Sequence, residues 1–262
     1  MVGIVIVSHS ATLAEGVTEL AREMGGGTPI EAAGGLDEPG RPLGTDAAFV
    51  LGAVKRAYSD DGVLVLMDLG SAILSAEMAI EMLEPAQQAR VILSEAPLVE
   101  GAVAAAVTAG AGADLEAVAQ EARRGIEAKT DHLRGSSAIP GEDGGDEVGG
   151  KQQYGPDATV ALQLVIQNPS GLHARPAARF VKAASSAGAE VTVTNLTKGR
   201  GPANARSLVS IATLGVACGD EVRIEARGEG AKETIAALEG LAERHFDEHA
   251  SPGPAGPSSR SL

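Results

Sequence analysis

One stretch near the middle divides the chain into two units that must fold separately. Residues 134–157, RGSSAIPGEDGGDEVGGKQQYGPD, are rich in Gly, Ser, Pro and acidic side chains and have no apolar period. Such a segment buries too little apolar surface to offset the entropy lost on ordering, so we expect a flexible linker. Residues 248–262 have a similar composition and are expected to form a disordered tail. The sequence thus predicts one domain over residues 1–133 and another over residues 158–247.

The first unit alternates apolar runs with helical patterns. Continuous runs of Val, Ile and Leu predict buried strands, and periods of 3.6 residues predict helices. The expected strands cover 2–8, 28–35, 62–68 and 89–95, and the expected helices cover 12–24, 45–58 (with Thr45 as N-cap), 71–83, 98–110 and 114–133. Buried strands separated by helices are typical of an α/β fold with a doubly wound parallel sheet. Ligands of such sheets lie at the carboxyl ends of the strands.

The second unit has a different pattern, with apolar and polar residues alternating along its strands. The expected strands cover 159–166, 190–196 and 220–227, and the expected helices start near 174, 205 and 230. A Gly-rich turn is expected over 197–204. Few strands, half-buried patterns and two or three helices predict an α+β open-faced β-sandwich.

Composition excludes several classes of function. Cys218 is the only cysteine, so a disulfide within the chain is impossible, which suits a reducing cytosol. The chain begins without a basic signal-peptide region, and its apolar runs fall short of the ~20 residues of a membrane span, so we expect a cytoplasmic protein without membrane contact. The five histidines have no metal-ligand spacing, and the Gly-rich stretches do not fit nucleotide-binding motifs. We therefore expect no metal and no cofactor.

Charge differs between the two units. Residues 1–133 contain 8 Lys/Arg and 20 Asp/Glu, a balance of −12, whereas residues 158–247 contain 10 and 9, a balance of +1. The acidic balance argues against nucleic acid as the ligand of the first unit. The asymmetry is compatible with two units that attract one another and equally with ordinary solvated surfaces.

The string GLHARPAARFV, residues 171–181, combines a helix start with a histidine and an arginine. Pro176 fits the first turn of a helix, so His173 is expected at or near the N-cap. The free amides of Ala174 and Arg175 and the helix dipole would there bind an anion, and the Arg175 guanidinium adds a planar cationic donor. An imidazole in this place can carry a phosphoryl group. The alternative is a histidine that only caps a helix.

A second histidine follows the first strand. His9 lies at the carboxyl end of the run GIVIVS, and Asp68 and Ser71 follow the third apolar run in VLMDLGSA. If the first and third strands are neighbours, Asp68 can fix the tautomer of His9 and leave the other ring nitrogen free to attack. Amides at the following helix start could bind a phosphoryl oxygen. The alternative is that His9 and Asp68 lie in unrelated loops.

Both histidine motifs resemble those of known phosphocarriers. Residues 158–246, with GLHARPAARFV and LGVACGDEVRIEARGEGA, resemble HPr, the histidine-containing phosphocarrier of the bacterial phosphotransferase system. This resemblance implies that His173 is phosphorylated, that Arg175 binds the phosphate, and that the fold is an open-faced β-sandwich. Ser207 lies where some HPr proteins carry a regulatory serine, but a plain helix N-cap is the favoured interpretation.

Residues 1–133, with GIVIVSHSATLAEG, DLGSAILSAEMA and LVEGAVAAAV, resemble the phosphotransferase subunit of the dihydroxyacetone kinases, whose first domain has the mannose-type enzyme IIA fold. This resemblance implies that His9 carries phosphate and that the first domain dimerises. The chain reads DLGSA where mannose-type transporter components tend to read Gly-Gly-Ser after the Asp, and fusion to an HPr-like domain also occurs in the kinase subunit.

The two resemblances together imply a phosphotransferase acting as a relay. Enzyme I, phosphorylated by phosphoenolpyruvate, would phosphorylate His173, which would pass the group to His9. His9 would pass it to ADP on a kinase subunit that phosphorylates dihydroxyacetone. The flexible linker would let the second domain visit two partners. Two alternatives stay open: a mannose-type IIA component of a sugar transporter, and a regulator controlled by its phosphorylation state.

Overall fold

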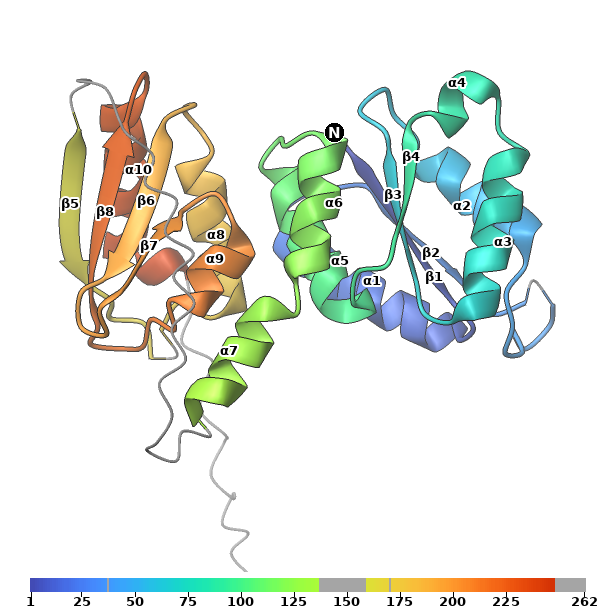
Figure 1. Ribbon diagram of the computed structural model, residues 1–262, viewed down its shortest axis with the longest axis horizontal. Helices are drawn as coiled ribbons and strands as arrows, with labels where there is room; N and C mark the ends of the chain where they lie inside the picture. The colour runs from blue at the N-terminus through green and yellow to red at the C-terminus, as the bar shows by residue number, and fades with distance from the viewer. Residues whose placement is uncertain (37, 137–158, 170, 248–262) are drawn as a thin grey trace, which may run out of the picture.

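The computed structural model describes residues 1–36, 38–136, 159–169 and 171–247, which form two folded units side by side (Figure 1). The expected tail at 248–262 and nearly all of the expected linker lie outside the described residues. Helix α7, Glu127–Ser136, continues past residue 133, where the first unit was predicted to end. Within the described residues, no helix combines the length and the apolar character that crossing a bilayer requires.

The first unit is built on a parallel four-stranded sheet, as predicted. Its strand order is β2-β1-β3-β4, with β1 at Gly3–Ser8, β2 at Ile30–Gly34, β3 at Val63–Met67 and β4 at Val91–Ser94. Strands β1 and β3 are hydrogen-bonded neighbours, and Val7 pairs with Met67 in their register. The loops after these two strands therefore leave the same edge of the sheet at adjacent positions, which is where His9 and Asp68 lie.

Helices cover both faces of this sheet, which confirms the doubly wound architecture. Helices α1 (Ala11–Gly25), α5 (Leu98–Gly110) and α6 (Leu115–Arg124) cover one face, and α2 (Ala47–Ala57) and α3 (Gly70–Glu81) cover the other. Successive side chains of a strand point to opposite faces. Ile4 and Ile6 of β1 accordingly pack in the core under α1 and α5, whereas Val5 and Val7 pack under α2 and α3.

The structure corrects three local predictions in this unit. The helix expected over 114–133 is divided at Gly125 into α6 and α7, and a Cβ at Gly125 would lie 2.8 Å from the carbonyl carbon of Glu100. Asp46, rather than Thr45, caps α2, since its carboxylate accepts the amides of Ala48 and Phe49. The short helix α4, Pro85–Gln88, was not predicted.

The second unit is an antiparallel sheet with helices packed on one face, the predicted open-faced sandwich. Its strand order is β5-β8-β6-β7, with β5 at Val160–Val165, β6 at Glu190–Asn195, β7 at Arg200–Asn204 and β8 at Glu221–Arg227. Strand β7 replaces the expected Gly-rich turn. The helices are α8 (Ala174–Ala184), α9 (Leu208–Thr213), α10 (Ala231–Glu243) and the 3₁₀ turn η1 (His245–Asp247).

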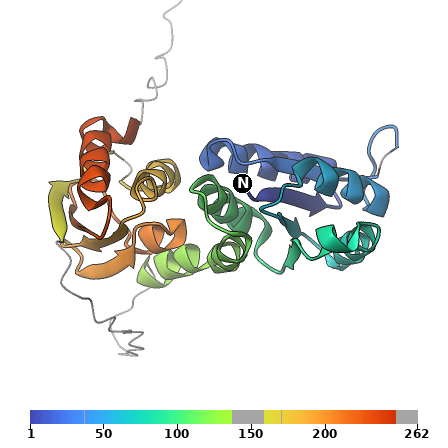
Figure 2. The ribbon, with the colours of Figure 1, turned by 90° about the horizontal axis from the view of Figure 1, so that it is seen from above.

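The two units meet through helices. Figures 1 and 2 show α8 and α9 of the second unit facing α5 and α6 of the first, with the two sheets on the outer sides of this double layer. Helix α7 extends the contact by packing along α9. Val107 of α5 is 3% exposed and belongs to the hydrophobic core of the second unit. The units therefore share a packed boundary, which the sequence did not predict.

Candidate functional site

His9 begins the loop after β1, at the carboxyl edge of the parallel sheet. The last residue of β1 is Ser8, and Ser10 caps α1 by accepting the amide of Leu13 at 3.3 Å. His9 is thus held between the end of a fully buried strand and the start of a helix. Its carbonyl accepts the amide of Gly44, at 3.0 Å, from the loop that precedes α2.

Asp68, directly after β3, binds both the backbone and the ring of His9. One carboxylate oxygen accepts the His9 amide at 2.9 Å and the Ser8 hydroxyl at 2.8 Å. The other lies 2.9 Å from His9 Nδ1 and accepts the amide of Leu69 at 2.7 Å. The predicted convergence of the two loops is confirmed. Ser8, the first residue of the SHS motif, was missed by sequence reasoning, although its place beside His9 was a usable signal.

These contacts set the protonation state of the pair. Burial by itself would raise the pKa of Asp68, but hydrogen bonds from the His9 amide, the His9 ring, the Ser8 hydroxyl and the Leu69 amide together lower this pKa below its ordinary value of 3.8. Asp68 is therefore a carboxylate at neutral pH and accepts a proton shared by Nδ1. The proton on Nδ1 leaves the lone pair on Nε2, which is the nucleophilic position of the ring.

The Nε2 side of the ring faces the start of α3. Nε2 forms a hydrogen bond with the Ser71 hydroxyl. The N-cap of α3 is Leu69, whose side chain makes no cap hydrogen bond, so the first amides of this helix have no side-chain acceptor. Those amides and the helix dipole form a favourable place for an anion next to Nε2. His9, Asp68 and Ser71 thus come together as predicted.

His173 is the N-cap of α8 and lies exposed at the surface. Its backbone is extended, with φ −74° and ψ −177°, and its side chain makes no cap hydrogen bond. The first intrahelical bond runs from the Ala177 amide to the His173 carbonyl at 2.9 Å. The amides of Ala174 and Arg175 therefore have no intrahelical acceptor, and His173 occupies the N-cap position that the sequence predicted.

Gly171 fixes the approach of the chain to this helix. Its φ is +67°, and a Cβ at this position would lie 2.1 Å from the carbonyl oxygen of Val216. The next amide, of Leu172, donates to that same oxygen at 3.0 Å. Only glycine combines this positive φ with so close a backbone contact. The loop between α9 and β8 thereby holds His173 at the surface.

Arg175 extends from the first turn of α8 toward the first unit. Its Nη2 lies 3.5 Å from a carboxylate oxygen of Glu23 on α1, and the side chain remains 59% exposed. An exposed ion pair of this kind contributes little to stability and can exchange partners. The guanidinium can therefore leave Glu23 for another anion with little loss.

Ser207 lies apart from both histidines. It is 5% exposed and caps α9, since its hydroxyl accepts the amide of Ser210 at 3.0 Å. The same hydroxyl donates to Glu121 of the first unit. Sequence reasoning missed Glu121, which has the spacing of an ordinary solvated helix residue. Within the described residues, no cluster of three or more His, Cys, Asp and Glu could hold a metal ion.

Both units match families of the phosphotransferase system (PTS). Residues 3–119 match the PTS system fructose IIA component family, and residues 160–244 match the PTS HPr component phosphorylation site family. Among solved structures, the HPr-C-His protein of Thermoanaerobacter tengcongensis is 38% identical, with a TM-score of 0.32 over 35% of this chain and 99% of that one.

Relatives named DhaM match both units together. This chain is 41% identical over 257 residues to the phosphoryl donor subunit DhaM of the PEP-dependent dihydroxyacetone kinase of Klebsiella michiganensis, and 42% identical over 250 residues to that of Escherichia coli. It aligns with 97% and 95% of its own length but spans about half of theirs, 53% and 51%.

A shorter relative is matched along nearly its whole length. The DhaM subunit of dihydroxyacetone kinase 2 of Listeria innocua is 39% identical over 121 residues, which cover 96% of that protein and 46% of this chain. The predicted resemblance is therefore confirmed, and the chain belongs to the DhaM family of phosphoryl donor subunits.

Proposed function

We propose that this chain relays a phosphoryl group from enzyme I of the phosphotransferase system, through His173 and then His9, to ADP on a dihydroxyacetone kinase subunit. One observation carries the proposal: a single chain places two histidines, each beside free helix amides, in two units that match the PTS HPr and PTS IIA families. The names of the DhaM relatives supply the kinase and the phosphoenolpyruvate.

At His173, the imidazole would attack the phosphorus of phosphorylated enzyme I as the bond from that phosphorus to the donor histidine breaks. The amides of Ala174 and Arg175 would bind the phosphoryl oxygens, and the Arg175 guanidinium would leave Glu23 to neutralise their charge. Phosphoryl transfer needs chiefly such positioning and charge stabilisation. The exposed setting of His173 suits a large protein donor.

At His9, Nε2 would attack the same phosphorus as its bond to His173 breaks. The attack places positive charge on the ring, because Nδ1 keeps its proton, and the Asp68 carboxylate stabilises this charge at 2.9 Å. Ser71 and the first amides of α3 would bind the phosphoryl oxygens. In the last step an oxygen of the ADP β-phosphate would attack the phosphorus, the P–N bond would break, and His9 would return to its neutral form.

The proposal includes a homodimer formed by the first domain. Large apolar side chains on and around α3 support it: Leu69, Ile73, Leu74, Met78 and Met82 are 42–63% exposed. An exposed apolar stripe of this kind marks an interaction surface. Light scattering should report a dimer, and Leu74→Glu should shift it to monomer without changing the fold.

The order of transfer can be tested with labelled phosphoenolpyruvate and enzyme I. In the full chain both histidines should be labelled. His9→Ala should retain label at His173, whereas His173→Ala should lose label at both positions unless free HPr is added. Label at His9 in the His173→Ala chain with enzyme I alone would overturn the relay, because His9 would then receive phosphate directly.

A further inference from the structure

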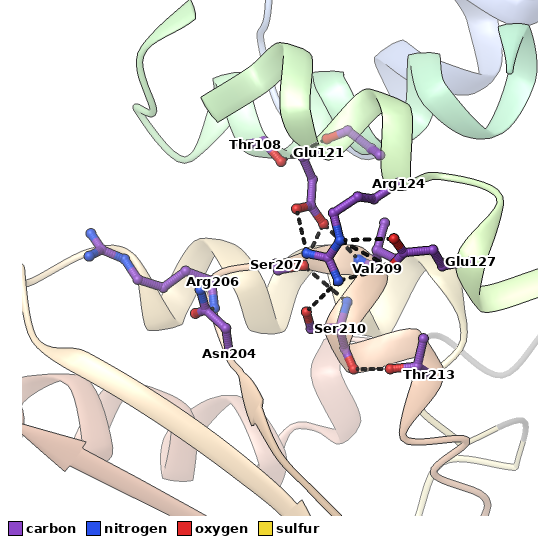
Figure 3. A network of polar contacts seen from close by, with 11 residues as sticks. Thr108, Glu121, Arg124, Glu127, Asn204, Arg206, Ser207, Val209, Ser210 and Thr213 are labelled. Carbon is purple, nitrogen blue, oxygen red and sulfur yellow. Dashed lines mark hydrogen bonds and ion pairs between the residues drawn. The ribbon is translucent and has the colours of Figure 1, made fainter. Parts of the chain in front are cut away.

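A buried carboxylate joins the two units. Glu121 of α6 is 7% exposed, and its Oε1 accepts hydrogen bonds from the hydroxyl of Ser207 and from the amide of Val209, the latter at 3.1 Å (Figure 3). Ser207 is the N-cap of α9 in the second unit, and Val209 lies in the first turn of that helix. Glu121 belongs to the first unit and Ser207 to the second, so this contact exists only when the units are docked.

The second oxygen of the Glu121 carboxylate also has a partner. That oxygen lies 3.5 Å from Nη1 of Arg124, whose Nη2 also lies 3.5 Å from the Ser210 hydroxyl (Figure 3). Glu127 holds the Arg124 guanidinium in place at 2.9 Å. A buried carboxylate is costly unless hydrogen-bonded and paired, and here each oxygen has a partner. We call Glu121, Ser207 and the Val209 amide the latch.

Apolar packing surrounds the latch. Val107 lies in the hydrophobic core of the second unit, and Met24, Val103 and Ala111 of the first unit pack against that core. The remaining core residues of each unit pack within that unit. Most of each core thus belongs to a single unit, and Val107 is a residue of the first unit that is buried in the core of the second.

The docked position lies at the wrong edge of the parallel sheet for transfer. The end of α8 lies at the amino edge of the sheet, because Lys182 of α8 and its C-cap Ser185 line one groove with Met1, which precedes β1. His9 follows β1 at the carboxyl edge. Arg175 pairs with Glu23 near the end of α1, whereas His9 precedes the start of α1, and the turns between Ser10 and Glu23 span ~20 Å. In-line transfer needs both imidazoles on opposite sides of one phosphorus atom.

We propose that the docked arrangement is a resting state, in which the latch holds the HPr-like unit on its own IIA unit away from His9, and that the latch must open before phosphate passes from His173 to His9. The part concerning phosphate rests on the proposed relay, whereas the docking itself does not.

The latch can be opened from either side. Glu121→Ala removes the acceptor, and Ser207→Asp replaces a donor with a carboxylate that repels Glu121. Losing hydrogen bonds to a charged group should lower the ratio of docked to undocked chain by roughly 10-fold or more. In the full chain, small-angle scattering should then give a larger radius of gyration, and the Val209 amide should exchange hydrogen at least roughly 10-fold faster.

Glu116→Ala is the matched control, because Glu116 lies on the same helix and contacts only Arg123 of the first unit in the contacts described. It should leave scattering and exchange as in the natural chain. The docking proposal is wrong if the natural chain already scatters as two separated units, or if Glu121→Ala and Ser207→Asp leave both readouts unchanged while the chain stays folded by circular dichroism.

A single-turnover measurement tests the consequence for transfer. Chain loaded with phosphate at His173 should label His9 faster in Glu121→Ala than in Glu116→Ala. If the latch variants separate the units but transfer is not faster, docking does not limit the relay and the resting-state proposal is wrong. The scattering and exchange readouts involve no phosphate, so they distinguish this failure from a failure of the proposed function.

Discussion

The side chain of His9 is hydrogen-bonded through both ring nitrogens and is 25% exposed, whereas His173 is the exposed N-cap of α8. A buried strand end, a carboxylate and a hydroxyl fix the first ring. The second lies at the start of α8, whose residue Arg175 is exposed and paired with Glu23. The first site is organised before phosphate arrives, and the second leaves room for a protein to approach.

This contrast fits the two positions in the proposed relay. His173 would exchange phosphate with proteins, so its exposure at the surface matters to it. His9 would deliver phosphate to a nucleotide, so a fixed tautomer and a defined direction of attack matter more. The following variants should affect one site and spare the other.

The largest effect is expected from Asp68→Asn. The variant removes the negative charge that stabilises the ring of His9 as it gains phosphate and no longer enforces the proton on Nδ1. Transfer from His173 to His9 should slow by roughly 10²–10⁴-fold, while labelling of His173 by enzyme I stays unchanged. Rapid-quench labelling of the two sites measures both steps. An equal rate at His9 would show that Asp68 only positions the loop.

Gly171→Ala should affect the other site through the fold. An alanine would need a positive φ and would place its Cβ 2.1 Å from the Val216 oxygen, so the loop must shift. We expect the second unit to lose about 2–4 kcal/mol of stability, while the first unit unfolds as before. Differential scanning calorimetry of the full chain should show one transition moving. Gly188→Ala is the control, since Gly188 also has a positive φ but has open space around its Cβ position.

Arg175→Ala should slow phosphorylation of His173 by about 10-fold, the value of one hydrogen bond between charged groups. Arg175→Lys should recover part of the rate, because lysine keeps the charge but loses the planar pair of donors. Transfer from phosphorylated enzyme I, followed by stopped-flow or rapid quench, reports this step. Arg175→Ala also removes the ion pair between Arg175 and Glu23. Glu23→Gln is the control for that loss, and it should leave the rate of His173 phosphorylation within about 2-fold.

The smallest effect concerns pH. The folded-state pKa of Asp68 lies below 3.8, so the stability this group contributes is complete above that value and is lost as the pH falls through the lower folded-state pKa. From about pH 5 to 8 Asp68 therefore adds no pH dependence to transfer at His9. Carbon-detected NMR titration of the Asp68 carboxyl should give a midpoint below 3.8. A midpoint above 3.8 would mean that burial outweighs the hydrogen bonds from His9 and Ser8.

Much of this fold could be predicted because its local patterns agree with its tertiary structure. Continuous apolar runs placed β1 and β3 in a buried parallel sheet, and their adjacency brought Asp68 to His9. The position of His173 at a helix N-cap followed from Pro176 and Gly171 on either side of it. Strand β7 could not be predicted in this way, since Arg200–Asn204 is largely exposed and carries no alternating pattern.

The features that were missed depend on contacts distant in sequence. Gly125, where the predicted helix divides, packs closely against the backbone of Glu100, a contact that helical periodicity does not reveal. Glu121 has the spacing of a solvated residue but is 7% exposed, at the place where it meets Ser207 and Val209. Charge asymmetry between the units was visible in the sequence, but it could not specify that a carboxylate would meet the start of α9.

Reconstitution tests the central claim most directly. Purified enzyme I, this chain and the ADP-loaded kinase subunit, with the subunit that binds dihydroxyacetone, should convert phosphoenolpyruvate and dihydroxyacetone to pyruvate and dihydroxyacetone phosphate. Turnover should require both His173 and His9 and should stop in either alanine variant, with free HPr restoring only the His173→Ala chain. Absence of turnover with the natural chain, together with transfer from His9 to a sugar-specific IIB protein, would contradict the proposed relay to the kinase.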